Sequence, residues 1–358
     1  MKPNRLIVFD MDGVIVDVSR SYRDTIRQTV RLFFKGARSW ENLPDPLFPL
    51  SDLARVKQSG GLNNDWDLTY LVINLLFTVT QPTQSKKKGL ARQPLQGTSG
   101  QGGGEDADIW FKYKKAVNHC DVTALAQFLK STNRPLTTLL KKRGRVNDKF
   151  IMSLYAGDVG TGNIIKQIFQ EIYLGKDLFE STYGLHTKIY HGEGYINREK
   201  LLVDKPVLDS LSKDNMLAIA TGRPKIEADY PLDYFGLRKY FTIIFTLDDC
   251  IREEKKILER EGKKVSLGKP DPYMLDAIAE IKKHEASELY YVGDMPDDMV
   301  AASRSKAGFK GVGLLFSDPD KVILKEYLLR AGADYIIKDF TELTDIIMGG
   351  EGSYNGYR

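Results

Sequence analysis

The sequence predicts an α/β protein with a doubly wound parallel sheet and a large, mostly helical insertion after the first strand. Short apolar runs that end abruptly at Asp, Thr or Gly are typical of parallel strands buried on both faces. Segments with helical spacing alternate with these runs over the second half of the chain. The part that follows the first run holds helical patterns and few strand signals.

Length and composition limit the class of protein. At 358 residues the chain exceeds a typical domain of about 150 residues, which predicts two domains or one with a large insertion. Apolar residues at 42% and charged residues at 28% exclude a fibrous or wholly disordered chain. The distant Cys120 and Cys250 exclude a disulfide scaffold. The apolar runs at 6–9 and 71–79 are too short for a signal peptide or a membrane span, so we expect a cytoplasmic protein without a membrane partner.

The expected core elements follow in order along the chain. The predicted strands are residues 6–9, 216–220, 241–245, 289–292, 312–316 and 335–337. Helices are predicted at 206–211 and 272–283, with others in between. This alternation is typical of a Rossmann-like core, which we place at residues 1–19 and 202–348, with 349–358 as a frayed tail.

Residues 20–201 are predicted to form a helical cap domain, with helices at 22–34, 67–77, 164–173 and in parts of 109–142. Residues 82–108 are too polar and Gly-rich to bury a core and are predicted to be a flexible loop. Residues 82–149 hold fourteen Lys and Arg but five Asp and Glu, against a net charge of +4 for the whole chain. That segment could be a solvated face or could dock an acidic partner. Because no aromatic-rich RNA-binding signature accompanies it, we expect no nucleic-acid partner.

The first polar motif, Asp10-Met11-Asp12-Gly13-Val14, directly follows the first strand. Two carboxylates one residue apart in a cleft need a cation to neutralise them. Hard oxygen ligands of this kind suit Mg²⁺. Asp10 and Asp12 are therefore predicted to lie at a metal site.

Three further polar signals follow predicted strands or precede a helix, where open α/β sheets bind their ligands. Thr221 and the N–H of Gly222 could hold a phosphate, although a threonine there is also a common turn residue. Lys269, between Gly268 and a proline, could neutralise a carboxylate and a phosphate together. Asp294 is placed for a metal ion with Asp298 behind it as an orienting group; the alternative is that the acids after Asp294 cap the next helix.

Together these four segments resemble the motifs of the haloacid dehalogenase-like hydrolase superfamily, over residues 5–13 and about 200–347. The helical insertion is similar to the cap of its subfamily IA phosphatases. The resemblance implies that Asp10 is a nucleophile that forms an aspartyl-phosphate, and that Asp12 is the general acid and base.

The same resemblance implies that Mg²⁺ is held by Asp10, Asp294 and the backbone carbonyl of Asp12, and that Thr221 and Lys269 bind the phosphoryl group. The expected enzyme is a Mg²⁺-dependent phosphomonoesterase, a phosphoric monoester hydrolase, acting on a small phosphorylated metabolite. Dehalogenases of the family lack the second Asp and the metal ion, so dehalogenation is disfavoured. A transport ATPase is excluded because no membrane spans are predicted.

Three residues are candidates for substrate recognition. Asn64 and Asp65 lie in a polar stretch after two glycines and could present hydrogen-bonding groups, or could cap a helix from Asp67. Arg223 could contact a second anionic group of the substrate or pair with Glu227. These segments resemble a helical-cap subgroup in which some members are fused to enzymes of histidine biosynthesis, which implies a metabolite such as histidinol phosphate.

Other functions remain open at this stage. A phosphomutase of a sugar phosphate would use the same scaffold and the same motifs. A phosphonate hydrolase would need a cap lysine that forms a Schiff base, for which Lys57 is the candidate. A binding or regulatory module would use the basic segment at 82–149 to dock an acidic partner or a nucleic acid. The sequence carries no signal for an oligomeric state.

Overall fold

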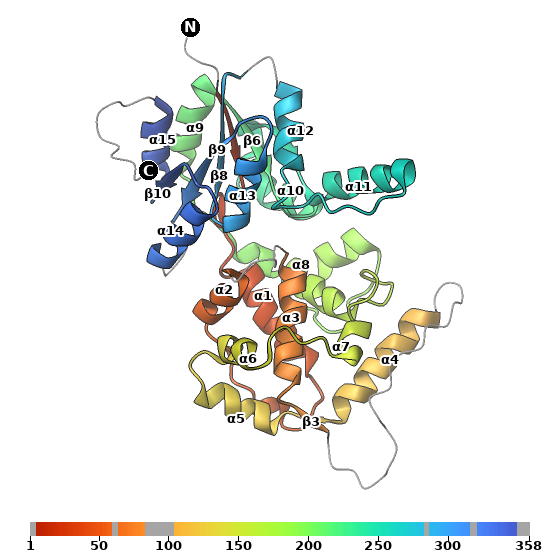
Figure 1. Cartoon of the computed structure of the whole chain (residues 1–358). Coiled ribbons are helices and arrows are strands. Elements are labelled where there is room, and N and C mark those ends of the chain that lie inside the picture. Colours follow the sequence, from red (N-terminus) through yellow and green to blue (C-terminus); the bar gives the residue numbers. More distant parts are fainter. Residues whose placement is uncertain (1–4, 59–63, 83–103, 283–285, 316–320, 349–358) are drawn as a thin grey trace. The chain divides into compact units, whose positions relative to one another are not determined.

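The computed structural model describes residues 5–58, 64–82, 104–282, 286–315 and 321–348. The chain forms two compact units (Figure 1). A core unit comprises Met1–Val18 and Glu199–Arg358, and a helical unit comprises Ser19–Arg198. Most of the predicted Gly-rich loop and all of the predicted tail lie outside the described residues.

The core unit contains a six-stranded sheet in the order β10–β9–β8–β1–β6–β7, and the neighbouring strands are parallel. Its strands are β1 (Arg5–Phe9), β6 (Asn215–Ala220), β7 (Phe241–Phe245), β8 (Glu288–Gly293), β9 (Lys310–Leu314) and β10 (Tyr335–Ile337). Strand β1 lies inside the sheet and pairs with β6 and β8. Residues 6–9 of this strand are fully buried, as the continuous apolar run predicts. The predicted α/β fold class is therefore confirmed.

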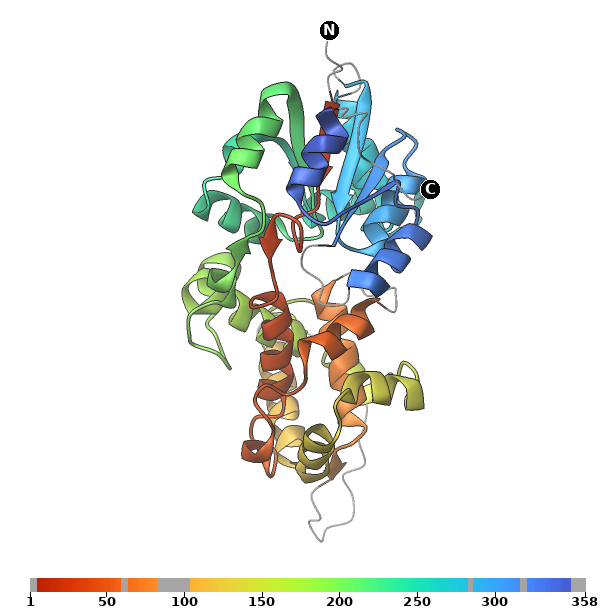
Figure 2. The ribbon, with the colours of Figure 1, turned by 90° about the vertical axis from the view of Figure 1, so that its left-hand side faces the viewer.

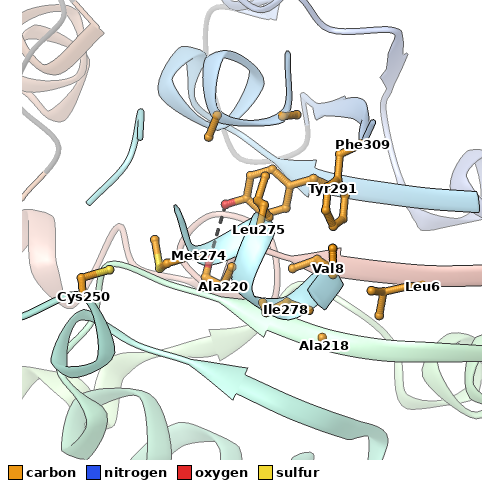
Figure 3. Close-up of a cluster of buried hydrophobic side chains, with 13 residues drawn as sticks. Leu6, Val8, Ala218, Ala220, Cys250, Met274, Leu275, Ile278, Tyr291 and Phe309 are labelled. Atoms are coloured by element: carbon orange, nitrogen blue, oxygen red, sulfur yellow. Dashed lines mark hydrogen bonds between the residues drawn. The ribbon is translucent and has the colours of Figure 1, made fainter. Parts of the chain in front are cut away.

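Helices cover both faces of this sheet. They are α9 (Lys205–Asp214), α10 (Lys225–Tyr234), α11 (Leu247–Glu261), α12 (Tyr273–Lys282), α13 (Pro296–Arg304), α14 (Lys321–Arg330) and α15 (Phe340–Met348). Helices α9 and α15 lie on one face, toward the viewer in Figure 2, and α12 lies on the other. Because side chains alternate along a strand, Leu6 and Val8 pack with Ile278 of α12 (Figure 3), whereas Phe9 meets the ring of Phe340 in α15.

A short antiparallel pair marks where the chain leaves the core unit and returns to it. Strand β2 (Val16–Asp17) pairs with β5 (Lys200–Leu201), and Leu202 N donates to Ile15 O at 2.9 Å. The intervening segment is thus inserted directly after β1, as the sequence predicts.

The helical unit is built from eight α-helices within its described residues. They are α1 (Tyr22–Phe33), α2 (Leu50–Gln58), α3 (Asp65–Phe77), α4 (Gly104–Asn118), α5 (Thr123–Ser131), α6 (Pro135–Arg143), α7 (Lys149–Ser153) and α8 (Ile164–Tyr183). Helix α3 is buried on all sides over residues 71–77, which makes it the centre of this unit. Tyr22 of α1 stacks on Tyr173 of α8 with ring centroids 4.1 Å apart.

Several details differ from the predicted elements. Helix α3 begins at Asp65 rather than at Asp67, because Asn64 caps it. Helix α8 continues beyond residue 173 and bends at Gly175, which has a φ of 72°. Among the described residues, no helix combines the length and apolar character needed to cross a membrane.

Candidate active site

Three neighbouring strands deliver the polar residues of the site at their carboxyl ends. Asp10 follows β1, Thr221 follows β6 and Asp294 follows β8. The chain continues the sheet pairing at two of these points, since Asp10 N donates to Val292 O at 2.8 Å and Thr221 N donates to Phe245 O at 3.0 Å. Rigid strands therefore fix these side chains at one edge of the sheet, the place where open α/β sheets bind ligands.

A tight turn follows Asp10. Met11 O accepts hydrogen bonds from the N–H groups of Ile15 and Val16 at 2.9 and 3.0 Å. Gly13 lies in this turn with a φ of 74°, in the left-handed region that favours glycine. A Cβ atom at Gly13 would lie only 2.0 Å from Oδ2 of Asp294, so the turn needs a glycine to pack against this carboxylate.

We expect Gly13→Ala to weaken Mg²⁺ binding by about tenfold or more, because the added methyl group must displace the Asp294 carboxylate. Isothermal titration calorimetry measures this loss. Gly262→Ala is the matched control: its φ is also positive, at 65°, but no atom lies within 4 Å of the added Cβ. Equal Mg²⁺ affinity in the two variants would contradict a role of Asp294 in the metal site.

One partly buried ammonium group joins two buried carboxylates of the site. Lys269 Nζ lies 2.8 Å from Asp10 Oδ1 and 2.7 Å from Asp298 Oδ1. The hydroxyl of Tyr291, on β8, donates to the same oxygen of Asp298 at 2.9 Å. Burial acts to lower the pKa of Lys269, but the carboxylates of Asp10 and Asp298 outweigh it and hold that pKa well above its usual value.

Negative charge exceeds positive charge around Asp10. Its burial raises the pKa of Asp10 to about 7; Lys269 opposes this rise, and the carboxylates of Asp298 and Asp12 add to it. The ammonium of Lys269 therefore does not offset the cost of burying the Asp10 carboxylate among acidic neighbours.

The acidic residues form a group that could hold a metal ion. Asp10, Asp294 and Asp298 are buried, and one carboxylate oxygen from each lies within 4.8 Å of the others. Hard oxygen donors from several carboxylates gathered at one place fit a divalent cation such as Mg²⁺. Asp298 also accepts from Lys269 and Tyr291 and, through Oδ2, from Met295 N, which suits it to orient its neighbours rather than to bind the ion first. That last contact also caps α13, as the alternative interpretation of the acids after Asp294 predicts.

The turn after β6 offers donors for an anion. Thr221 is buried and its Oγ1 accepts from Arg223 N at 3.2 Å. Within the described part of the chain no acceptor is found for the Thr221 hydroxyl proton, which is left to donate. Gly222 is exposed, and no atom lies within 4 Å of where its Cβ would be. The backbone at Gly222 therefore has open space beside it, as a bound phosphate would need.

Arg223 contacts its predicted neighbour Glu227 and two acidic side chains. Its Nη1 donates to the backbone carbonyl of Glu227 at 3.0 Å. It also forms ion pairs with Glu199 at 2.9 Å and with Asp12 at 2.6 Å. Glu199 was not identified from the sequence, because it lies outside every motif and only the return of the chain from the helical unit brings it to Arg223.

In the helical unit, Asn64 and Asp65 have structural contacts. Asn64 Oδ1 accepts from Asp67 N at 2.7 Å and caps α3. Asp65 Oδ1 accepts from Lys57 Nζ at 3.0 Å. Asn64 thus stabilises the start of α3, as the alternative interpretation of this stretch predicts. Asp65, the first residue of that helix, forms an ion pair with Lys57.

Comparison with known proteins assigns most of the sequence to a family. A family model described as haloacid dehalogenase-like hydrolase matches residues 4–306. A 71-residue stretch is 34% identical to an imidazoleglycerol-phosphate dehydratase of Phytophthora nicotianae, but it covers 20% of this chain and 13% of that protein.

Two solved structures resemble the whole chain. An X-ray structure of a Northeast Structural Genomics Consortium target has a TM-score of 0.60 at 22% identity and covers 97% of this chain and 98% of its own. Phosphatase Tt82 from Thermococcus thioreducens has a TM-score of 0.46 at 17% identity, with coverage of 90% and 99%. The first likeness supports the fold.

Proposed function

This chain belongs to the haloacid dehalogenase-like hydrolase family, and we propose that it is a Mg²⁺-dependent phosphomonoesterase that acts on a small phosphorylated metabolite. One observation carries the proposal: a buried carboxylate, Asp10, is held 2.8 Å from an ammonium group at the sheet edge where two more buried carboxylates and the Thr221 turn lie. Phosphoryl transfer mainly needs positioning and neutralisation of charge, and these groups supply both.

In the first proposed step, Asp10 attacks the phosphorus atom while the bond from phosphorus to the leaving oxygen breaks. Asp12 gives its carboxyl proton to that oxygen, and an aspartyl-phosphate remains on Asp10. Lys269 neutralises the nucleophile and a phosphoryl oxygen, and the Thr221 hydroxyl with the Gly222 N–H donates to the others.

In the second step, the Asp12 carboxylate takes a proton from water as the water oxygen attacks phosphorus. The bond between Asp10 and phosphorus breaks, which restores the carboxylate and releases inorganic phosphate. When bound, Mg²⁺ held by Asp10, Asp294 and the backbone carbonyl of Asp12 would supply positive charge to the phosphoryl oxygens. Asp12 also separates this reaction from dehalogenation, because a halide leaves without a proton and an alkoxide does not.

The helical unit is the proposed source of substrate selectivity. A substrate that uses Asn64 or Asp65 would have to replace their present contacts with Asp67 N and with Lys57. The short similarity to an imidazoleglycerol-phosphate dehydratase supports testing imidazole-containing phosphates, histidinol phosphate among them.

Phosphate release from a broad panel of phosphorylated metabolites tests the function. We expect release in Mg²⁺ from one chemical class, loss of that release in EDTA, and no release by Asp10→Asn. Transfer of the phosphoryl group to a sugar phosphate, dependent on a bisphosphate activator, would contradict hydrolysis and favour a phosphomutase. Lack of both reactions would favour a binding module.

A further inference from the structure

Arg223 links the proposed general acid to a second buried carboxylate. Its Nε donates to Asp12 Oδ1 at 2.6 Å. The other end of the guanidinium faces Glu199, with Nη2 donating to Oε1 at 2.9 Å and Nη1 donating to Oε2 at 3.1 Å. Such a two-point pair fixes the plane of the guanidinium, which a lysine ammonium could not do.

The backbone of Arg223 is also fixed. Its N–H donates to Thr221 Oγ1 at 3.2 Å, and its carbonyl accepts from Leu247 N at 3.0 Å. Nη1 additionally donates to the Glu227 carbonyl at 3.0 Å. The guanidinium is therefore held from both ends of the side chain, within the turn that carries the phosphate-binding Thr221.

Burial differs along this chain of contacts. The side chains of Arg223 and Glu199 are each 1% exposed, whereas that of Asp12 is 29% exposed. The cost of removing two charges from water largely offsets their attraction, so a buried ion pair adds little to the stability of the fold. Stability alone therefore gives little reason for the pair of Arg223 with Glu199. What it achieves geometrically is to anchor one oxygen of a carboxylate that remains open to solvent.

We propose that Arg223, held by Glu199, is a positioning residue that fixes the Asp12 carboxylate through Oδ1 and leaves Oδ2 to carry the proton in both steps. This inference rests on the proposed phosphomonoesterase function. It replaces the prediction that Arg223 binds a second anionic group of the substrate, because the guanidinium is buried and already engaged by two carboxylates and a carbonyl.

Two substrates with different leaving groups can distinguish a positioning role of Arg223 from a substrate contact or a general structural role. p-Nitrophenolate leaves without protonation, so the formation of aspartyl-phosphate from p-nitrophenyl phosphate needs no acid. Hydrolysis of the aspartyl-phosphate in the second step still needs Asp12 as a base. An alkyl phosphate needs Asp12 in both steps. Rapid-mixing kinetics with the two substrates in Mg²⁺ therefore measures how well Asp12 is placed.

We expect Arg223→Lys to keep the rapid burst of p-nitrophenolate while steady-state turnover falls about 10²-fold. This loss is at the lower end of the rate enhancement that general acid–base catalysis typically provides, because Asp12 is misplaced but not removed. With the alkyl phosphate, the single-turnover rate should fall by a similar factor at an unchanged KM. Glu199→Gln should show the same pattern with a smaller loss, and the double variant should lose no more than Arg223→Lys alone. Arg238→Lys is the matched control, since Arg238 is also paired with two aspartates, Asp229 and Asp233, but is exposed.

Three outcomes would overturn the inference. A burst that slows as much as turnover would indicate a general loss of the site, and a raised KM alone would indicate a substrate contact. Unchanged kinetics in both variants would show that Asp12 needs no anchor. If Arg223→Lys does not fold, Glu199→Gln decides by the same readout. If the wild-type protein gives neither a burst nor turnover with either substrate, the proposed function fails and this inference falls with it.

Discussion

Asp10→Asn is expected to abolish turnover of every phosphorylated substrate, by at least about four orders of magnitude in kcat, because an amide is a poor nucleophile. The fold should persist, since asparagine has nearly the same shape. Phosphate release and acid-stable capture of labelled phosphoenzyme measure the two consequences. Asp177→Asn, which changes an exposed carboxylate of α8, is the control and should behave as the wild type. Residual phosphoenzyme in Asp10→Asn would place the nucleophile elsewhere.

The same substitution should stabilise the metal-free protein at neutral pH. The pKa of Asp10 is raised from 3.8 to about 7, chiefly by burial. Between these two values the folded protein keeps a proton that the unfolded chain has lost, so the free energy of unfolding of the wild type falls as pH rises through this window. The asparagine side chain does not titrate, so the variant does not lose stability in this way.

Melting curves of the two proteins in EDTA test this stability difference. The melting temperature of Asp10→Asn minus that of the wild type should increase from about pH 4 to pH 7 and stay level above it. Mg²⁺ should reduce the difference, because it stabilises the wild-type carboxylates by binding the folded state. A difference that does not change with pH would show that folding does not raise the pKa of the Asp10 carboxyl.

The parts of the site that lie at strand ends follow from the sequence pattern. A buried parallel strand must be apolar along its length, so a polar residue that ends the run stands at the sheet edge. Asp10, Thr221 and Asp294 are all of this kind, and the structure brings them together because β6 and β8 flank β1. Each of these residues closely follows an apolar run, so the order of the strands in the sheet is not needed to identify it.

The remaining contacts depend on tertiary structure that has no local pattern. Tyr291 lies within the apolar run of β8, and its ring packs in the core beside Leu275 (Figure 3). Its hydroxyl also donates to Asp298, a contact that no local pattern in the sequence indicates. Glu199 meets Arg223 only because the inserted segment ends beside β2. Helix α2 was missed because its pattern is interrupted by polar residues, although Leu53 and Val56 are buried. Side-chain networks of this kind require the fold first.

Lys269→Met is expected to damage both activity and stability, because it removes the ammonium between two buried carboxylates. Without one donor to the developing charge, kcat should fall by about 10³-fold. Breaking a buried ion pair from one side costs about 3–5 kcal/mol of unfolding free energy. The pKa of Asp10 should rise further, since Lys269 is the group that lowers it. Activity assays and chemical denaturation measure the two losses.

A surface lysine on the same sheet provides the control. Lys310 pairs with Glu288 at 3.1 Å with its side chain 41% exposed, so Lys310→Met should change stability by less than about 1 kcal/mol and leave turnover intact. Adding Asp298→Asn to Lys269→Met removes one uncompensated carboxylate and should recover part of the stability but none of the activity. Such a split would show that the ammonium serves folding by neutralising Asp298 and serves chemistry through Asp10. Recovery of both properties together would contradict a direct role for Lys269 beside the nucleophile.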